Sequence, residues 1–177
     1  MIGLQQCRVM AEAPDGTVLF IVGMHINHWW SVHRWVPVAL SMRRMLDELI
    51  RNRDLGLLGK PRIFTSGRLI VVIQYWKSFD ALEAYARSGS AEHLPAWKAF
   101  RTVVRDSAAV GIFHETYTIT KGNHESIYIN LPNSVLLGAA VDVSGIGDAD
   151  DSSRERLKRK WRLPPFGRLQ LRFRENS

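Results

Sequence analysis

The first part of the chain passes from a continuous apolar run to an amphipathic stretch. Residues 17–26 are mostly β-branched and aromatic without regular polar alternation, which is typical of a strand covered on both faces. In residues 38–53, apolar side chains recur at steps of three and four, and charged side chains occupy the other positions. Gly56 follows as a usual stop signal. The pattern therefore predicts a buried strand followed by an amphipathic helix.

The rest of the chain continues to alternate between strand and helix patterns. In order, the predicted elements are a leading strand at 5–12, the strand and helix above, strands near 60–65 and 69–76, a helix after Ser78, a helical piece at 93–106, and strands near 112–120 and 126–131. This is the split βαβ or ferredoxin-like order with one extra strand. The sequence therefore predicts an α+β fold, an antiparallel sheet with helices on one face.

Charge is concentrated at the C-terminal end of the chain. The formal net charge is +7, but residues 1–153 hold equal numbers of basic and acidic side chains, so the whole excess lies in residues 154–177. A nucleic-acid-binding protein is expected to carry its charge on the folded surface that docks. We therefore expect one domain at residues 1–147, a flexible polar and then basic tail at 148–177, and no specific nucleic-acid partner.

Cysteine content and apolar run length indicate the compartment. The single cysteine, Cys7, cannot form an internal disulfide, and no charged start leads into an apolar segment as in a secretory signal. The longest apolar run, residues 18–24, is far shorter than the ~20 residues that a membrane helix needs. We therefore expect a cytoplasmic protein that does not enter a membrane.

Histidines are the first candidates for chemistry, because a neutral imidazole can act as a base or metal ligand near pH 7. His93 opens a predicted helix, and Trp97 lies four residues later on the same face. His93 is either functional or a residue that caps the helix and packs beside Trp97. His33 lies among tryptophans, as a pocket-wall residue or as a catalyst. His114 precedes Glu115 but lacks the second histidine of a zinc-binding helix motif, because Thr118 stands there.

The strand near residue 115 is expected to place neighbouring side chains on opposite faces. His114 and Glu115 therefore cannot act on one ligand from the same face of a regular strand. Glu115 is either a base with a raised pKa on an apolar face or the partner of an arginine such as Arg87 or Arg101. Aromatic residues that either line a pocket or belong to the core are Tyr75, Trp76 and Tyr117.

Six segments, in order along residues 5–157, resemble the monooxygenase af470-like family. They are Gly23–Asn27, Val32–Trp35, Gln74–Trp76, Tyr85–Arg87, His93–Trp97 and Val110–Tyr117. The chain has His25 where the family tends to have arginine, and Phe113 where it tends to have tryptophan. The resemblance implies a dimeric α/β barrel, in which two four-stranded sheets pack face to face.

The resemblance also bears on cofactors and on the site. The same superfamily includes cofactor-free monooxygenases and haem-dependent enzymes, so the fold does not decide the chemistry. In related barrel proteins a haem-ligating histidine lies on or near the helix that His93 opens, which makes haem a candidate cofactor and His93 its candidate ligand. No glycine-rich fingerprint for NAD or FAD follows any predicted strand. Asn27, in the first matching segment, joins the candidate substrate contacts with Tyr75, Trp76, Trp97 and Tyr117.

Two functions follow from these observations. The first is a small-molecule monooxygenase-like enzyme that acts on an apolar substrate in a His- and Trp-rich pocket, with His93, His33, His114 or Glu115 in the catalytic role. The second is a non-catalytic protein that binds haem or a hydrophobic ligand in the same pocket. Either form is expected to be a homodimer, because a sheet with helices on one side leaves an apolar face that needs a partner.

Overall fold

A four-stranded antiparallel sheet forms the centre of the protein. The computed structural model describes residues 8–88, 108–131, 135–147 and 152–158, so the predicted helical piece at 93–106 lies outside the described residues. The strand order is β3 (Leu57–Ser66), β4 (Leu69–Trp76), β2 (Thr17–Ile26), β5 (Val110–Ile119), and every neighbouring pair is antiparallel. The predicted α+β fold with an antiparallel sheet is therefore confirmed.

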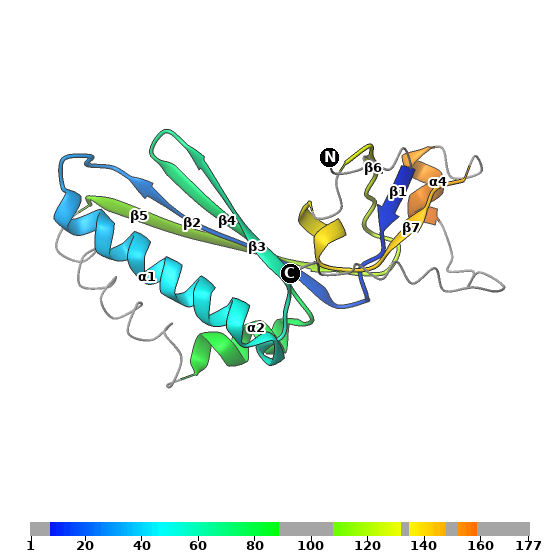
Figure 1. Cartoon of the computed structure of the whole chain (residues 1–177), viewed down its shortest axis with the longest axis horizontal. Coiled ribbons are helices and arrows are strands. Elements are labelled where there is room, and N and C mark those ends of the chain that lie inside the picture. The colour runs from blue at the N-terminus through cyan, green and yellow to red at the C-terminus, as the bar shows by residue number, and fades with distance from the viewer. Residues whose placement is uncertain (1–7, 89–107, 132–134, 148–151, 159–177) are drawn as a thin grey trace, which may run out of the picture.

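Two helices, α1 (Val32–Arg51) and α2 (Phe79–Arg87), lie on the same side of this sheet (Figure 1). The Ser78 hydroxyl accepts a hydrogen bond from the backbone N–H of Ala81 and caps α2, as the sequence predicts. Helix α1 begins six residues earlier than predicted. The Trp35 indole N–H donates to the Trp29 carbonyl oxygen, and the two rings stack 5.5 Å apart, so aromatic contacts order the loop before this helix.

Apolar side chains from the sheet and the helices form two clusters. Val18 and Trp76 are completely buried and pack with Leu49 of α1 and with Leu82 and Tyr85 of α2. A second cluster, nearer the start of α1, contains Met24, Ile26, Val38, Ala109 and Val110. The stripe of apolar residues on α1 thus faces the sheet, as its spacing predicts. No helix in the described part of the chain has the length and apolarity needed to cross a bilayer.

A smaller three-stranded sheet lies beyond one end of the long strands (Figure 1). Its strand order is β6 (Tyr128–Ile129), β1 (Arg8–Ala11), β7 (Val143–Gly145). A short 3-10 helix, η2 (Leu136–Ala139), lies between β6 and β7 in the chain, and another, η1 (Arg53–Leu55), lies between α1 and β3. The strand predicted at 126–131 contributes only two residues to this sheet, and β7 was not predicted. Both are too short for a period of two to be recognised.

Helix α4 (Ser153–Lys158) occupies part of the range for which a flexible tail was predicted. Its Arg156 is 6% exposed and pairs with Glu125, and it also donates to the Ser153 hydroxyl oxygen. One basic residue of this segment is therefore buried and paired with an acidic side chain. Residues 159–177 lie outside the described part of the chain.

The other face of the large sheet carries apolar side chains that no helix of the described residues covers. Ile21 of β2 is paired with Ile73 of β4, and Phe64 and Tyr117 on the outer strands are each 50% exposed. Gly23 lies at the same face. A Cβ atom there would lie 2.5 Å from the Phe113 ring, so the glycine lets this ring lie over β2.

Candidate functional site

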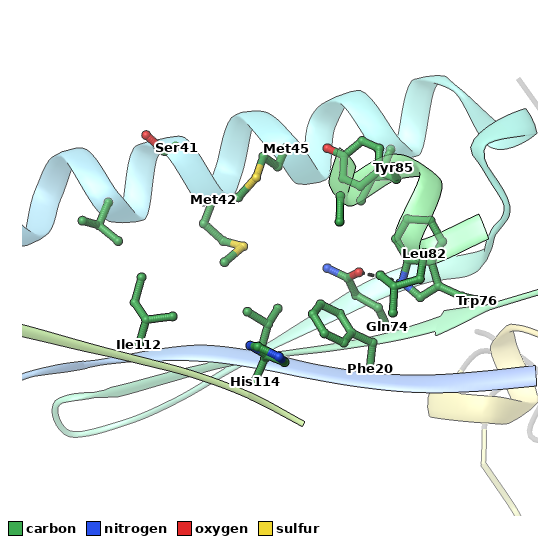
Figure 2. Close-up of a pocket in the computed structure, with 14 residues that line it drawn as sticks. Phe20, Ser41, Met42, Met45, Gln74, Trp76, Leu82, Tyr85, Ile112 and His114 are labelled. Carbon is green, nitrogen blue, oxygen red and sulfur yellow. Dashed lines mark hydrogen bonds between the residues drawn. The ribbon is translucent and has the colours of Figure 1, made fainter. Parts of the chain in front are cut away.

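A cavity of about 140 Å³ lies between the large sheet and the two helices (Figure 2). Its wall is mostly aliphatic, aromatic and thioether side chains from β2, β4, β5, α1 and α2. The lining residues that Figure 2 labels are Phe20, Ser41, Met42, Met45, Gln74, Trp76, Leu82, Tyr85, Ile112 and His114. Since polar groups are few in this wall, each one that faces the cavity is a candidate for orienting or reacting with a ligand.

His114 is the one described histidine among the cavity-lining residues. It stands on β5, an edge strand, opposite Val22 of β2, and the alternation of the strand turns its side chain towards the helices. Its ring centroid is 5.8 Å from that of Phe20, and no described residue makes a hydrogen bond to its nitrogens in the structure. His114 is exposed, so its imidazole lies at the open side of the cavity. The imidazole is therefore accessible both to solvent and to a ligand in the cavity.

Gln74 is a second polar residue at this cavity, and it is 5% exposed. The indole N–H of the completely buried Trp76 donates a 2.9 Å hydrogen bond to its side-chain oxygen. Because an indole nitrogen can only donate, this contact fixes the orientation of the amide. The amide NH₂ of Gln74 then points into the cavity (Figure 2). It is a preorganised donor for an oxygen atom of a ligand.

Gln74 was not among the candidate residues predicted from the sequence, although it lies in one of the six segments that resemble the family. The signal was present, because Gln74 is the only residue in the strand segment from Leu69 to Trp76 whose side chain is neither aliphatic nor aromatic. A buried amide in an apolar strand requires a hydrogen-bond partner, and the partner two residues later on the same face is Trp76.

Tyr85 also lines the cavity, and its hydroxyl is hydrogen-bonded to a residue of α1. It donates a 2.9 Å hydrogen bond to a carboxylate oxygen of Glu48, and its ring lies 5.7 Å from that of Trp76. These contacts hold α2 against α1 and the sheet. Tyr85 thus supports the wall of the cavity.

Glu115 and Tyr117 lie on the opposite face of β5 from His114, as strand alternation predicts. The Tyr117 hydroxyl donates to a carboxylate oxygen of Glu115 at 2.5 Å. This hydrogen bond, together with the negative charge of Glu115, raises the pKa of Tyr117 above its ordinary value. Arg87, one of the two arginines expected beside Glu115, pairs instead with Glu83 on its own helix. Neither Glu115 nor Tyr117 lines the cavity.

Three further candidates also lie outside the cavity. The Asn27 side chain contacts the His25 ring and donates to the Ala108 carbonyl oxygen, so it ties the end of β2 to the residues before β5. His33 is exposed in the first turn of α1 and accepts a hydrogen bond from Arg34. Tyr75 packs against the cluster beneath the smaller sheet, and burial raises its pKa.

His93 and Trp97, the remaining candidates, lie outside the described residues. Within the residues that the structure describes, no group of three His, Cys, Asp or Glu side chains is placed to hold a metal ion. Haem does not fit the described cavity beside His114. A cavity of about 150 Å³ accommodates a molecule such as benzene, whereas a porphyrin contains four pyrrole rings.

Comparisons with known proteins agree with this architecture. Residues 17–137 match the model of a family described as monooxygenase af470-like. Monooxygenase af470 of Aspergillus fumigatus is 29% identical over 152 residues, covering 74% of this chain and 53% of that protein. The chain thus spans about half the length of this relative. The match confirms the family resemblance seen in the six segments.

Solved structures resemble the chain in fold. An aldoxime dehydratase in complex with butyraldoxime matches with a TM-score of 0.64 and 18% identity, covering 78% of this chain and 41% of that one. A cofactor-independent oxygenase from Streptomyces nogalater matches more weakly, with a TM-score of 0.43 and 16% identity over 59% of this chain and 93% of that one.

Proposed function

Because this chain belongs to the monooxygenase af470-like family, we propose that it is an oxygenase-type enzyme that acts on a small apolar substrate in the cavity beside His114. The observation that carries the proposal is that two polar groups of different kinds line one otherwise apolar cavity. His114 supplies a proton acceptor, and the Gln74 amide supplies a fixed donor. A site that pairs a base with a preorganised donor suits proton abstraction next to a carbonyl group.

The reaction that these groups support begins at a methylene group next to a carbonyl. His114 accepts a proton from the methylene carbon, and the resulting negative charge moves to the carbonyl oxygen. The N–H of Gln74 donates a hydrogen bond to that oxygen and stabilises the anion. Dioxygen then oxidises the carbon, so that one oxygen atom becomes a new carbonyl and the other leaves as water with the two methylene hydrogens.

Oxygen uptake with two bicyclic ketones, 2-indanone and 2-tetralone, tests this proposal, because the benzene ring of each matches a cavity of about 140 Å³ and the second ring can extend to its open side. Each ketone has a methylene group between an aromatic ring and a carbonyl. We expect one dioxygen consumed for each diketone formed. The variant His114→Gln removes the base, and we expect its rate to fall by about 100-fold or more. His33→Gln is the matched control, because the same substitution falls on an exposed histidine outside the cavity.

The alternative, a protein that binds hydrophobic ligands without turnover, gives a different result in the same experiment. The ketones would bind, as titration calorimetry would detect, but oxygen uptake would not exceed the rate without protein. Uptake by His114→Gln at the wild-type rate would instead show that another group accepts the proton.

A homodimer that packs the uncovered faces of two large sheets together is the second part of the proposal. Ile21 and Ile73 lie at the centre of this face and would be buried by a partner copy. In the same row across the sheet, Arg62 is paired with Ile73 on one side, and Glu115 is paired with Ile21 on the other. A two-fold axis parallel to the strands places β3 of one copy, which carries Arg62, against β5 of the other, which carries Glu115. Opposite charges then meet at both edges, so the face is complementary to itself.

A further inference from the structure

The cavity beside His114 is small compared with the sites in which proteins usually bind organic ligands. Its volume of about 140 Å³ is close to that of a cavity that holds benzene, whereas sites for larger ligands usually measure about 300–1,000 Å³. Either the substrate is very small, or it extends into space beyond this cavity.

Such space exists beneath the same helix. A second cavity of about 360 Å³ lies between α1 and strands β3 and β4. Its wall includes Leu46, Ile63, Ile70 and Val72, which are apolar, and Arg43 pairs with Asp47 at its exposed rim. Together the two volumes reach about 500 Å³, within the range usual for a ligand-binding site.

Three residues line both cavities and form the partition between them, namely Val38, Met42 and Ile112. Val38 and Ile112 are β-branched, which restricts rotation about their first side-chain bond. Met42 is unbranched, with three rotatable bonds and a soft sulfur, so it can change rotamer at low cost. Figure 2 shows its side chain extending from α1 towards the strands, above Ile112 and His114. Met42 is therefore the movable part of the partition.

We infer that the two cavities form one channel for an elongated apolar molecule, and that Met42 sets how much of the channel a ligand can use. The reacting end of the ligand lies beside His114, and its apolar chain runs beneath α1 towards the edge formed by β3. This inference rests on the proposed function, because it extends the same site and assigns its substrate class.

Binding of 1-alkanols with 6 to 12 carbons, measured by titration calorimetry on the full chain, tests the channel. Each methylene group that becomes buried should tighten binding about fourfold. The first cavity is filled by about six carbons, so the affinity of the wild-type protein should keep rising well beyond hexanol.

Substitutions at Met42 should change this dependence on chain length. In Met42→Phe the partition is bulkier and stiffer, so the gain in affinity for each added carbon should stop near six carbons. In Met42→Ala the cavities merge, so decanol should bind at least as tightly as to wild type, a result that a merely misfolded variant would not give. Leu40→Phe is the matched control, because Leu40 is 50% exposed on the same helix and lines neither cavity.

The outcomes separate this inference from the proposed function. If hexanol binds but longer alkanols gain nothing, or if Met42→Phe keeps the full gain, the channel is wrong and the site beside His114 stands. If no alkanol of any length binds, the cavity is not a ligand site, and both ideas fail. If the length dependence holds but oxygen uptake does not depend on His114, the channel stands without the proposed chemistry.

Discussion

Gln74 illustrates how a single buried polar side chain depends on its partner. Its oxygen accepts from the Trp76 indole, and its NH₂ group is left for the cavity. The sequence left Trp76 as either a pocket-wall or a core residue and could not assign a direction to the Gln74 amide, because that direction follows from a contact between side chains. It did predict that His114 and Glu115 face opposite ways, because alternation along a strand requires no tertiary information.

Substitutions at Gln74 should separate its two roles. Gln74→Leu leaves the buried Trp76 N–H without an acceptor and should lower the free energy of unfolding by about 1–3 kcal/mol. Gln74→Glu keeps an acceptor for the indole, and its ionised carboxylate has no hydrogen to donate to the ligand, so at a pH at which this carboxyl is ionised oxygen uptake should fall by about 100-fold or more. Urea unfolding and oxygen uptake measure the two effects. Full activity in the glutamate variant with its carboxyl ionised would contradict the donor role.

At the scale of elements, the long periodic segments were predictable and the short ones were not. Strands β2 and β4 and helix α2 lie close to their predicted positions, because each presents a long apolar pattern or a clear cap. Helix α1 begins earlier than predicted because Pro37 lies inside it, and a proline interrupts the pattern that identifies a helix. Strand β7 and helix α4 depend on contacts between distant segments, which local pattern does not reveal.

The ion pair between Glu125 and the buried Arg156 of α4 should contribute to stability. Glu125→Ala removes the carboxylate that pairs with the buried Arg156 guanidinium, and should destabilise this part of the protein by about 3 kcal/mol. Replacing both residues with apolar ones, in the double variant Glu125→Leu/Arg156→Met, should cost less than the single change. Hydrogen exchange of the β1 amides reports both effects. A double variant less stable than Glu125→Ala would contradict a cost that arises from burying the arginine charge.

At the scale of the whole molecule, the uncovered sheet face leads to a prediction about assembly. Sedimentation of the wild-type chain should give a dimer. Ile21→Lys places a positive charge at the centre of the face and should give a monomer, because a charge buried in an apolar interface is costly. Leu40→Lys, on the exposed side of α1, should remain dimeric. A wild-type monomer at all concentrations would contradict the proposed packing.

Charge reversal tests the orientation of the two copies. Arg62→Glu alone should weaken the dimer, because it places a second negative charge opposite Glu115 of the partner. Combining it with Glu115→Arg should restore association. If the double variant stays as weak as the single one, the two edges do not meet in the dimer.

The central claim is that His114 takes a proton from an apolar substrate in the cavity beneath α1. The most direct measurement is exchange of the methylene hydrogens of 2-indanone with deuterated water, followed by NMR without oxygen, so that only proton abstraction is observed. We predict that the wild-type protein and His33→Gln accelerate exchange equally, and that His114→Gln loses this acceleration. Equal exchange by His114→Gln and the wild type would contradict the claim.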